Sequence, residues 1–484
     1  MVQKTNFRAL SVLVMVFFFW GFVAASNDIL IPVFKEKLHL AQWQSQMISF
    51  AFYVAYSIGS LLYFLISRAS KGDILNRIGY KNGIIYGLII SASGTLLFYP
   101  AAMLASFPLM ISGLFIVGLG FSLQQTAANP LVVVLGDPAK GSQRLSLAGG
   151  INNIGTTIGP VLVSLAIFGT ITATASLASI ESVKTPYLFL GAAFLLVAVV
   201  VRFSSMPNHI PHITEDTPEK TAKAEKTGIK FEKAIEYPQL WMGMIAIFVY
   251  VGVEVSTAAN LPEFMKQHLH TPTNQIAPYV SLFWASLMIG RWTGAIDVFS
   301  MKKSIKNTMI FLVPYLAFGL FILVNLIAGH DISEFWVYTA IIPGLILADF
   351  LSKGQPARQL FIFSLFGIIA LIIGMLADRT TSVFAFISVG MFCSTLWPCI
   401  FTLAISGLGK HTNQGSGFLI MMIMGGGFIS LAQGALASDK LLGIQYSYTI
   451  GVLCFAYLAF YALKVTGILK KQGVSLKPEK AIAH

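Results

Sequence analysis

Runs of about twenty apolar residues recur along the whole chain, and they restrict its fold more than any other feature. A helix needs about 20 apolar residues to cross the hydrocarbon core of a bilayer, which is about 30 Å thick. Charged residues make up 11% of the chain, whereas they make up about 25% of a globular domain. The sequence therefore predicts an all-α integral membrane protein.

Fourteen runs are long and apolar enough to be candidate spans. They are residues 9–33, 43–67, 82–103, 107–134, 145–170, 186–203, 239–262, 277–299, 308–328, 334–351, 359–377, 382–406, 416–437 and 446–466. Only six of the 32 basic residues then fall on the side opposite the N-terminus, and these are Lys35, Lys37, Lys184, Lys266, Arg379 and Lys440. Because loops rich in Lys and Arg stay in the cytoplasm, both termini are predicted to be cytoplasmic.

Charge and cysteine placement argue against several other classes of function. The net charge of +12 is scattered among loops, so a nucleic-acid partner is not expected. Cys393, Cys399 and Cys454 lie inside apolar runs and lack metal-ligand spacing, so no metal site is expected from them. A membrane-embedded transferase should show a His/Asp or acidic cluster at a membrane face, and the sequence has none. We therefore expect neither an enzyme nor a cofactor.

One long hydrophilic stretch, residues 204–238, divides the chain after six spans. Its prolines and charges and its low apolar content predict a cytoplasmic linker, because such a segment cannot bury a core. The expected organisation is an N-terminal six-helix half at 1–203, a C-terminal half at 239–466 and a cytoplasmic tail at 467–484.

The two halves share a spaced motif. Asn129-Pro130 is followed eleven residues later by Gly141 and then by the polar helix GGINNIGTTIGP, and Trp397-Pro398 is followed by Gly409 at the same spacing and then by GGGF. Polar residues also precede a proline in both SNDILIP and EVSTAANLP. Chance similarity between apolar segments is the alternative. Duplicated halves around a midplane site are typical of transporters.

Several stretches carry a more specific resemblance. WGFVAASNDILIPVF, TAANPLVVVLG, RLSLAGGINNIG, GRWTG and the run from TLWPCIFTLAISGLGK to GFLIMMIMGGGF resemble the fucose permease family of the major facilitator superfamily. Glucose/galactose transporters and sodium-glucose transporters form the most similar branch. The resemblance implies two pseudo-twofold related six-helix halves. This family has one span between GRWTG and TLWP, whereas residues 300–382 hold three, so a transmembrane hairpin is expected near 306–353, with PARQLFIFSLF beginning the ninth family span.

The loop GDILNRIGYKNG at 72–83 resembles the superfamily signature that latches the two halves together. Asn76 stands where the family usually has aspartate, which weakens a latch based on charge. Arg77 in this loop is a candidate gating residue, and Arg291 with Asp297 can play the comparable part in the other half. The alternative is that these basic residues only set the topology.

Two carboxylates lie deep inside predicted spans, Asp28 and Glu254. A carboxylate at the centre of a membrane helix costs about 2.5–3.5 kcal/mol, so it normally faces a cavity or a partner. The resemblance gives Asp28 the role of coupling transport to a cation. A raised pKa would suit a proton, and Asp28 with Asn27 and backbone carbonyls would suit sodium. Asp297 and Asp349 lie near helix ends and require no functional role.

Amide side chains can donate to and accept from sugar hydroxyls without the cost of a charge. Gln125 and Asn129 share one helical face at i and i+4, and Asn152 and Thr156 repeat that spacing on the next span. The candidate substrate-binding residues are these amides, their neighbours and nearby aromatic residues. They are Gln124, Gln125, Asn129, Asn152, Asn153, Trp397, Tyr53 and Trp284, with Trp20 as a further aromatic candidate. Any of the aromatic residues could instead serve in packing or as an interfacial anchor.

Two positions depart from the fucose permease pattern. The permease has a glutamate before TAANP that takes part in proton coupling, and this chain has Gln125, which cannot titrate. Glu254 stands where the permease has a neutral polar residue. The number of carboxylates in the cavity is therefore expected to be kept, with one site moved to the other half.

Together these features predict a secondary transporter of the bacterial cytoplasmic (inner) membrane. It is expected to import a neutral hexose such as glucose, galactose or fucose by symport with a proton or sodium through alternating access. An exporter of drugs or other small metabolites by proton antiport is the alternative. The expected partners are a small-molecule sugar and the lipid bilayer, and the expected state is a monomer.

Overall fold

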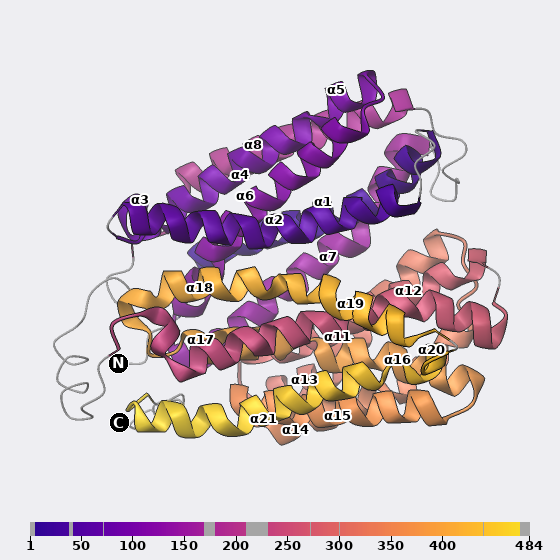
Figure 1. Ribbon diagram of the computed structural model, residues 1–484. Helices are drawn as coiled ribbons and strands as arrows, with labels where there is room; N and C mark the ends of the chain where they lie inside the picture. Colours follow the sequence, from indigo (N-terminus) through magenta and orange to yellow (C-terminus); the bar gives the residue numbers. More distant parts are fainter. Residues whose placement is uncertain are drawn as a thin grey trace.

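The computed structural model describes residues 5–37, 42–70, 72–168, 180–209, 231–271, 273–299, 301–438 and 440–474, and the regular structure in these ranges is helical (Figure 1). Side chains at 26–49 and at 163–183 lie outside the described ones, and this includes Asn27 and Asp28. The structure therefore places the helix that carries Asp28 and leaves its predicted role in coupling untested.

The first bundle comprises the helices up to the 204–238 segment. These are α1 (Phe7–Lys37), α2 (Gln42–Ala69), α3 (Ile74–Ile78), α4 (Tyr80–Leu96), α5 (Phe98–Met103), α6 (Phe107–Val134), η1 (Pro138–Lys140), α7 (Gly141–Phe168) and α8 (Ile180–Phe203). In Figure 1 this bundle is coloured indigo to magenta.

The second bundle comprises the helices from η3 onward. These are η3 (Ala234–Glu236), α11 (Pro238–Leu269), α12 (Thr273–Ala295), η4 (Ile296–Val298), α13 (Lys303–Ile327), η5 (Ser333–Ala340), α14 (Ile342–Ser352), α15 (Pro356–Leu376), α16 (Arg379–Cys393), α17 (Leu396–Ile405), η6 (Gly409–His411), α18 (Thr412–Met421), η7 (Met422–Met424), α19 (Gly425–Leu436), α20 (Gly443–Tyr446) and α21 (Thr449–Lys471).

Twelve stretches of the described chain are long and apolar enough to cross a membrane, so this is a multi-pass membrane protein. α7 and α12, with 28 and 23 residues, are also long enough to cross a membrane, but each carries an arginine and several amide or hydroxyl side chains. These two helices pack against each other where the bundles meet, and this position accounts for their polarity. With them, the helical segments correspond to the fourteen predicted runs.

Helix pairing in the second bundle repeats that of the first. α1 packs along α7 as α11 packs along α19, and α2 packs on α6 as α12 packs on α16. α4 contacts α6 and α8, and α15 likewise contacts α16 and α21. This order makes α15 the counterpart of α4, so α13 and α14 have no counterpart in the first bundle. The fold thus has the predicted internal duplication, with α13 and α14 added beside α12 and α15.

Glycines permit the closest helix contacts at equivalent places in the two bundles. A Cβ on Gly155 would lie 2.2 Å from the Phe18 carbonyl oxygen, where α7 crosses α1. A Cβ on Gly425 would lie 2.0 Å from the Phe248 carbonyl oxygen, where α19 meets α11. Small residues are favoured at such contacts because membrane helices associate through close packing. The glycine-rich motifs of the repeat therefore hold α7 against α1 in the first bundle and α19 against α11 in the second.

The bundles meet at one end of the molecule and diverge toward the other (Figure 1). We call the end at which α1 begins and α21 ends the terminal side, and the opposite end the far side. α3 and the start of α18 also lie at the terminal side (Figure 1). The ring of Phe7 stacks on that of Phe299 there, with centroids 5.8 Å apart.

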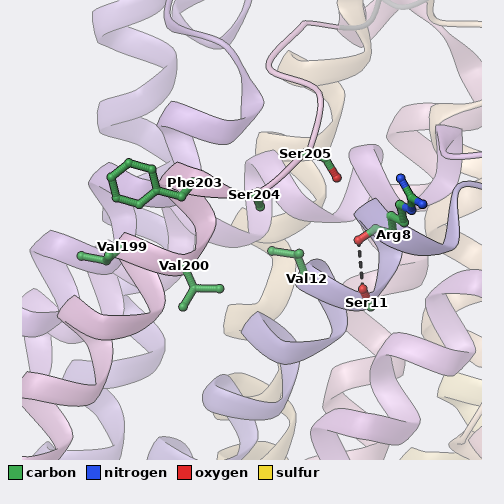
Figure 2. A pocket seen from close by; sticks show the side chains of 8 residues that line it. All are labelled: Arg8, Ser11, Val12, Val199, Val200, Phe203, Ser204 and Ser205. Carbon is green, nitrogen blue, oxygen red and sulfur yellow. Dashed lines mark hydrogen bonds between the residues drawn. The ribbon is translucent and has the colours of Figure 1, made fainter.

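A cavity of about 620 Å³ lies between α1 and α8, away from the contact between the bundles (Figure 2). It is lined by Arg8, Ser11, Val12, Val199, Val200, Phe203, Ser204 and Ser205. The Phe203 side chain is 84% exposed. This cavity belongs to the outer surface of the first bundle, and none of the predicted site residues lines it.

Candidate functional site

Gln124 and Gln125 on α6 point in different directions, because successive residues of a helix are rotated by about 100°. Gln124 is 0% exposed. Its oxygen accepts a hydrogen bond from Trp20 Nε1 at 2.7 Å, and its nitrogen donates to Ser91 Oγ at 2.9 Å. These bonds join α6 to α1 and α4 inside the first bundle. These bonds give Gln124 and Trp20 a structural role in the first bundle, and the substrate-binding role of Gln124 and the aromatic role of Trp20 stay predictions.

Gln125 and Asn129 lie on the other side of α6. The Gln125 side-chain nitrogen donates to the Tyr56 hydroxyl at 2.9 Å, which links α6 to α2. Asn129 is 2% exposed, and its side-chain nitrogen has no hydrogen-bond partner within the described structure. Tyr53 lies one turn before Tyr56 on α2, with its ring edge-to-face against Phe52 at a centroid distance of 6.2 Å. This face of α6 and α2 thus keeps donor capacity for a ligand.

Pro130 explains how the TAANP motif reaches the second bundle. A proline inside a helix has no N–H for the carbonyl four residues earlier, which here belongs to Thr126. The Thr126 carbonyl accepts a hydrogen bond from Ser416 Oγ of α18 at 3.0 Å instead. In the repeat, Pro398 lies in the first turn of α17, after the break that ends α16, and the Ser394 carbonyl four residues before it accepts from Arg291 Nε at 3.1 Å.

Asn152 and Asn153 on α7 also divide between two surfaces. The Asn152 side-chain nitrogen donates to the Phe17 carbonyl of α1 at 2.7 Å, within the first bundle. Asn153 faces the second bundle, where its oxygen accepts from Arg291 at 2.7 Å and its nitrogen donates to the Trp284 carbonyl at 3.3 Å. Asn153 is therefore a bridge between the bundles. The side chain of Trp284 is 38% exposed.

Arg291 is the centre of a polar group between the bundles. Besides Asn153 and Ser394, its guanidinium interacts electrostatically with the Glu254 carboxylate of α11. Tyr250, one turn before Glu254, donates its hydroxyl hydrogen to that carboxylate. The ring of Tyr250 lies 6.3 Å from that of Trp397, the aromatic residue next to Pro398. The structure therefore brings Glu254, Arg291, Asn153 and Trp397 together from four helices.

Sequence reasoning missed Tyr250, Tyr56 and Ser394 as members of this site. Tyr250 could have been found from the sequence, because it lies four residues before Glu254 and so on the same face of one helix. Tyr56 and Ser394 gave no such signal, because each partner lies on another helix.

The latch loop after α2 closes the terminal side through hydrogen bonds from Asn413 to Asn76 and Asp73 and, among the described residues, not through an ion pair. Asp73 caps α3 by accepting from the backbone nitrogens of Leu75 and Asn76 at 2.9 and 3.2 Å. Asn413 of α18 donates to Asn76 Oδ1 at 2.6 Å and to Asp73 at 3.3 Å, and it accepts from the Tyr80 hydroxyl at 2.6 Å. Asn76 thus forms a cross-bundle hydrogen bond, as a neutral replacement for the expected aspartate. Asn413 was missed because its partners precede it by more than 300 residues.

The carboxyl group of Asp73 lies in the loop between two spans. Burial raises its pKa above the ordinary value, although hydrogen bonds from Tyr63, Asn76, Asn413 and Leu75 oppose the shift. The Tyr63 hydroxyl donates to this carboxylate at 2.7 Å. Asp73 lies at the contact between the bundles, and its carboxyl group binds a proton more tightly there than in water. Closure of the terminal side is therefore sensitive to pH.

Arg77 takes no part in this latch. Its guanidinium donates to the Ser70 carbonyl at 3.3 Å, within the same loop, and the side chain is exposed. The predicted gating role of Arg77 is therefore not supported by its contacts, whereas Arg291 does bridge the bundles.

Further hydrogen bonds cross between the bundles. Lys140 Nζ donates to the Asp297 carbonyl at 3.0 Å, Trp292 Nε1 to the Gly150 carbonyl at 3.1 Å, and Ser57 Oγ to the Met421 carbonyl at 3.1 Å. In the described ranges, the cross-bundle hydrogen bonds lie between the middle of the helices and the terminal side. The molecule is therefore closed on the terminal side, and its bundles diverge toward the far side (Figure 1).

Comparison with known proteins decides the family. The model of the Major Facilitator Superfamily matches residues 12–352. The chain belongs to the Major Facilitator Superfamily. The predicted membership is confirmed, and so is the predicted fold class. As a member of this family the protein is a membrane transporter and not an enzyme.

Named relatives of this Major Facilitator Superfamily member share most of its length. It is 33% identical to the glucose/galactose transporter of Brucella abortus biovar 1 (strain 9-941), over 95% of each chain. It is 26% identical to the L-fucose-proton symporter of Escherichia coli (strain K12), over 92% of this chain and 90% of that protein. The crystal structure of the transporter FucP in the outward conformation matches with a TM-score of 0.71 at 26% identity, over 94% of this chain and 98% of that one.

Proposed function

We propose that this transporter imports a neutral hexose together with a cation by alternating access. The relatives named as glucose/galactose transporter and L-fucose-proton symporter support this substrate class. The observation that carries the proposal is the polar group between the bundles, where Asn153, Arg291 and Glu254 meet beside Trp397. Amides, an aromatic ring and few charges suit a ligand with many hydroxyls and a C–H face.

The proposed sugar-binding residues are the amides and aromatic residues near the contact between bundles, together with Asn152, whose side chain bonds to Phe17 within the first bundle. They are Gln125, Asn129, Asn152, Asn153, Tyr53, Trp284 and Trp397. The orphaned side-chain nitrogen of Asn129 supports this choice, because a buried donor without a partner costs about 1–3 kcal/mol until something accepts from it. An exporter of apolar compounds would need an apolar cavity, so the amides favour sugar import.

The terminal side is proposed to be cytoplasmic, from the distribution of Lys and Arg. With the terminal side closed and the bundles diverging toward the far side, the transporter then faces outward and can receive a sugar from outside the cell. Segment 204–238 is proposed as a cytoplasmic linker, the membrane as the bacterial inner membrane, and the working unit as a monomer.

Glu254 and Asp28 are proposed as the residues that couple transport to the cation. Glu254 supports a proton mechanism, because a carboxylate that accepts a hydrogen bond from Tyr250 and interacts electrostatically with Arg291 can change its hydrogen bonds when it is protonated. Asp28 with Asn27 remains the candidate for sodium, a hard cation that prefers oxygen ligands.

Counterflow in proteoliposomes tests the substrate. Vesicles preloaded with unlabelled glucose, galactose or fucose should accumulate the radiolabelled sugar transiently and with saturation. If no sugar gives saturable exchange, the hexose assignment is wrong.

Imposed gradients test the coupling. A proton or a sodium gradient should drive net uptake, and Glu254→Gln should abolish accumulation while leaving counterflow, because exchange needs no net cation movement. The matched Gln125→Asn variant should keep accumulation. If Glu254→Gln accumulates sugar normally, Glu254 does not couple transport. The same measurement on Asp28→Asn decides the role of Asp28.

A further inference from the structure

The added helices α13 and α14 are tied to α12 at the far side. Ser286 Oγ of α12 lies 2.6 Å from the Tyr338 hydroxyl of η5, and Tyr338 is 0% exposed. Tyr279 of α12 donates its hydroxyl hydrogen to Glu334, and its ring lies 4.9 Å from that of Phe335. α13 also packs along α12. The pair is therefore attached to the helix that carries Arg291.

At the terminal side α13 reaches the contact between the bundles. Lys306 forms an ion pair with the carboxylate of Asp297, in the turn η4 that ends α12. The backbone carbonyl of the same Asp297 accepts from Lys140 of the first bundle. Asp297 thus joins α13 with its side chain and the first bundle with its backbone.

Asp349 of α14 lies in the same group of charges. It interacts electrostatically with both Asp297 and Lys306. Gln359 of α15 donates to Asp349 at 3.3 Å and accepts from the Cys399 thiol of α17 at 3.4 Å. Lys306 therefore balances two carboxylates that would otherwise repel each other across η4 and α14.

The charges of Lys306, Asp297 and Asp349 lie beside a contact between the bundles in which several buried polar atoms lack hydrogen bonds. Four buried side-chain atoms near it, on both bundles, lack hydrogen-bond partners in the described structure, namely Ser142 Oγ, Gln143 Oε1, Thr395 Oγ1 and Thr402 Oγ1. Burying a polar atom without a hydrogen bond costs free energy, and water can bind these atoms when the terminal side opens. These atoms therefore favour the open state. α17 packs on α7 here, and a Cβ on Gly141 would lie 3.3 Å from the Thr402 methyl group. Closure consequently depends on contacts that offset this cost.

We propose that α13 and α14 act as a brace for closure of the terminal side, and that Lys306 is its positioning residue. By holding the Asp297 side chain of η4 against α13, Lys306 keeps the end of α12 where Lys140 and Asn153 can bind it. Loss of Lys306 shifts the transporter toward the state that is open on the terminal side. The proposal rests on the alternating access proposed above and is independent of the sugar and of the cation.

The test measures access to a reporter cysteine without any substrate. Ser142→Cys places a thiol at a position that is 2% exposed in the closed state, and the three native cysteines are buried. A membrane-impermeant maleimide is applied to the purified protein in nanodiscs, which leave both sides accessible. Because the Lys306–Asp297 pair is partly exposed, its contribution to closure is small, and Lys306→Gln should label about two- to fivefold faster.

Matched variants separate this role from a merely structural one. Lys303→Gln removes an exposed lysine three residues away and should label like the parent, and Lys306→Arg should restore slow labelling. Asp297→Asn keeps the backbone carbonyl for Lys140, so combining it with Lys306→Gln should label no faster than either single change. If Lys306→Gln proves unstable, the exchanged pair Lys306→Asp with Asp297→Lys should restore slow labelling.

Equal labelling of Lys306→Gln and Lys303→Gln would overturn the proposal, as would a fully additive double variant. A loss of sugar counterflow in the parent protein would overturn the hexose assignment and leave the labelling result intact. The two failures are therefore distinguishable.

Discussion

The hydrogen bond between Asn153 and Arg291 offers the sharpest test of how the bundles are held together. Asn153→Ala removes the acceptor that lies 2.7 Å from the guanidinium, together with the weaker donation to the Trp284 carbonyl. Hydrogen bonds to charged groups contribute about 1.5–3 kcal/mol in soluble proteins, but side-chain bonds between membrane helices average about 0.6 and reach about 1.7. A value of about 1–2 kcal/mol corresponds to about a five- to thirtyfold shift toward the open terminal side.

Asn152→Ala is the matched control, because the neighbouring amide bonds to Phe17 within its own bundle. Labelling of Ser142→Cys by an impermeant maleimide, without sugar, reports the opening. Asn153→Ala should label about five- to thirtyfold faster, and Asn152→Ala should lower thermal stability and weaken sugar binding without faster labelling. A double-mutant cycle with Arg291→Gln should give a coupling free energy of about 1–2 kcal/mol.

Two results would refute this reasoning. Equal labelling rates in Asn153→Ala and Asn152→Ala would mean that the cross-bundle bond does not hold the closed state. A coupling free energy near zero would mean that Asn153 and Arg291 act independently of each other.

Three further predictions concern the other amides and the latch. Gln125→Glu should add pH dependence to sugar transport, because it places a titratable group beside Tyr56, and an unchanged pH profile would argue against a coupling role at this position. Gln124→Leu should lower the free energy of unfolding by about 1–2 kcal/mol in thermal denaturation, since it leaves Trp20 Nε1 unpaired, and should not change the KM for sugar. The pKa of Asp73 is raised in the closed state, which therefore binds the proton more tightly, so labelling of Ser142→Cys should slow as pH falls by more than the falling thiolate fraction of the cysteine explains; Asp73→Asn should remove this excess dependence.

Sequence alone determined the spans, the duplication and the motifs that matter. In a bilayer each helix satisfies its own backbone hydrogen bonds, so length and apolarity suffice to locate it. The positions of Pro130 and Pro398 were also evident from the sequence, and each proline lacks an N–H. The carbonyls four residues earlier accept from Ser416 and Arg291 instead. The chemistry of the repeat could thus be anticipated, although its partners could not.

Tertiary structure decided which of the polar residues face the contact between bundles. Gln124 and Gln125 are adjacent in sequence, yet Gln124 is buried and bonds to Trp20 and Ser91, whereas Gln125 bonds to α2. The rotation of the helix and the neighbouring helices set the direction of each side chain. Asn152 and Asn153 divide in the same way between α1 and α12. From the sequence, Asn76 weakens the predicted latch, because it replaces the expected aspartate. In the structure, packing places Asn413 within hydrogen-bond distance of it. Such assignments depend on contacts between residues far apart in the chain, which composition and spacing do not encode.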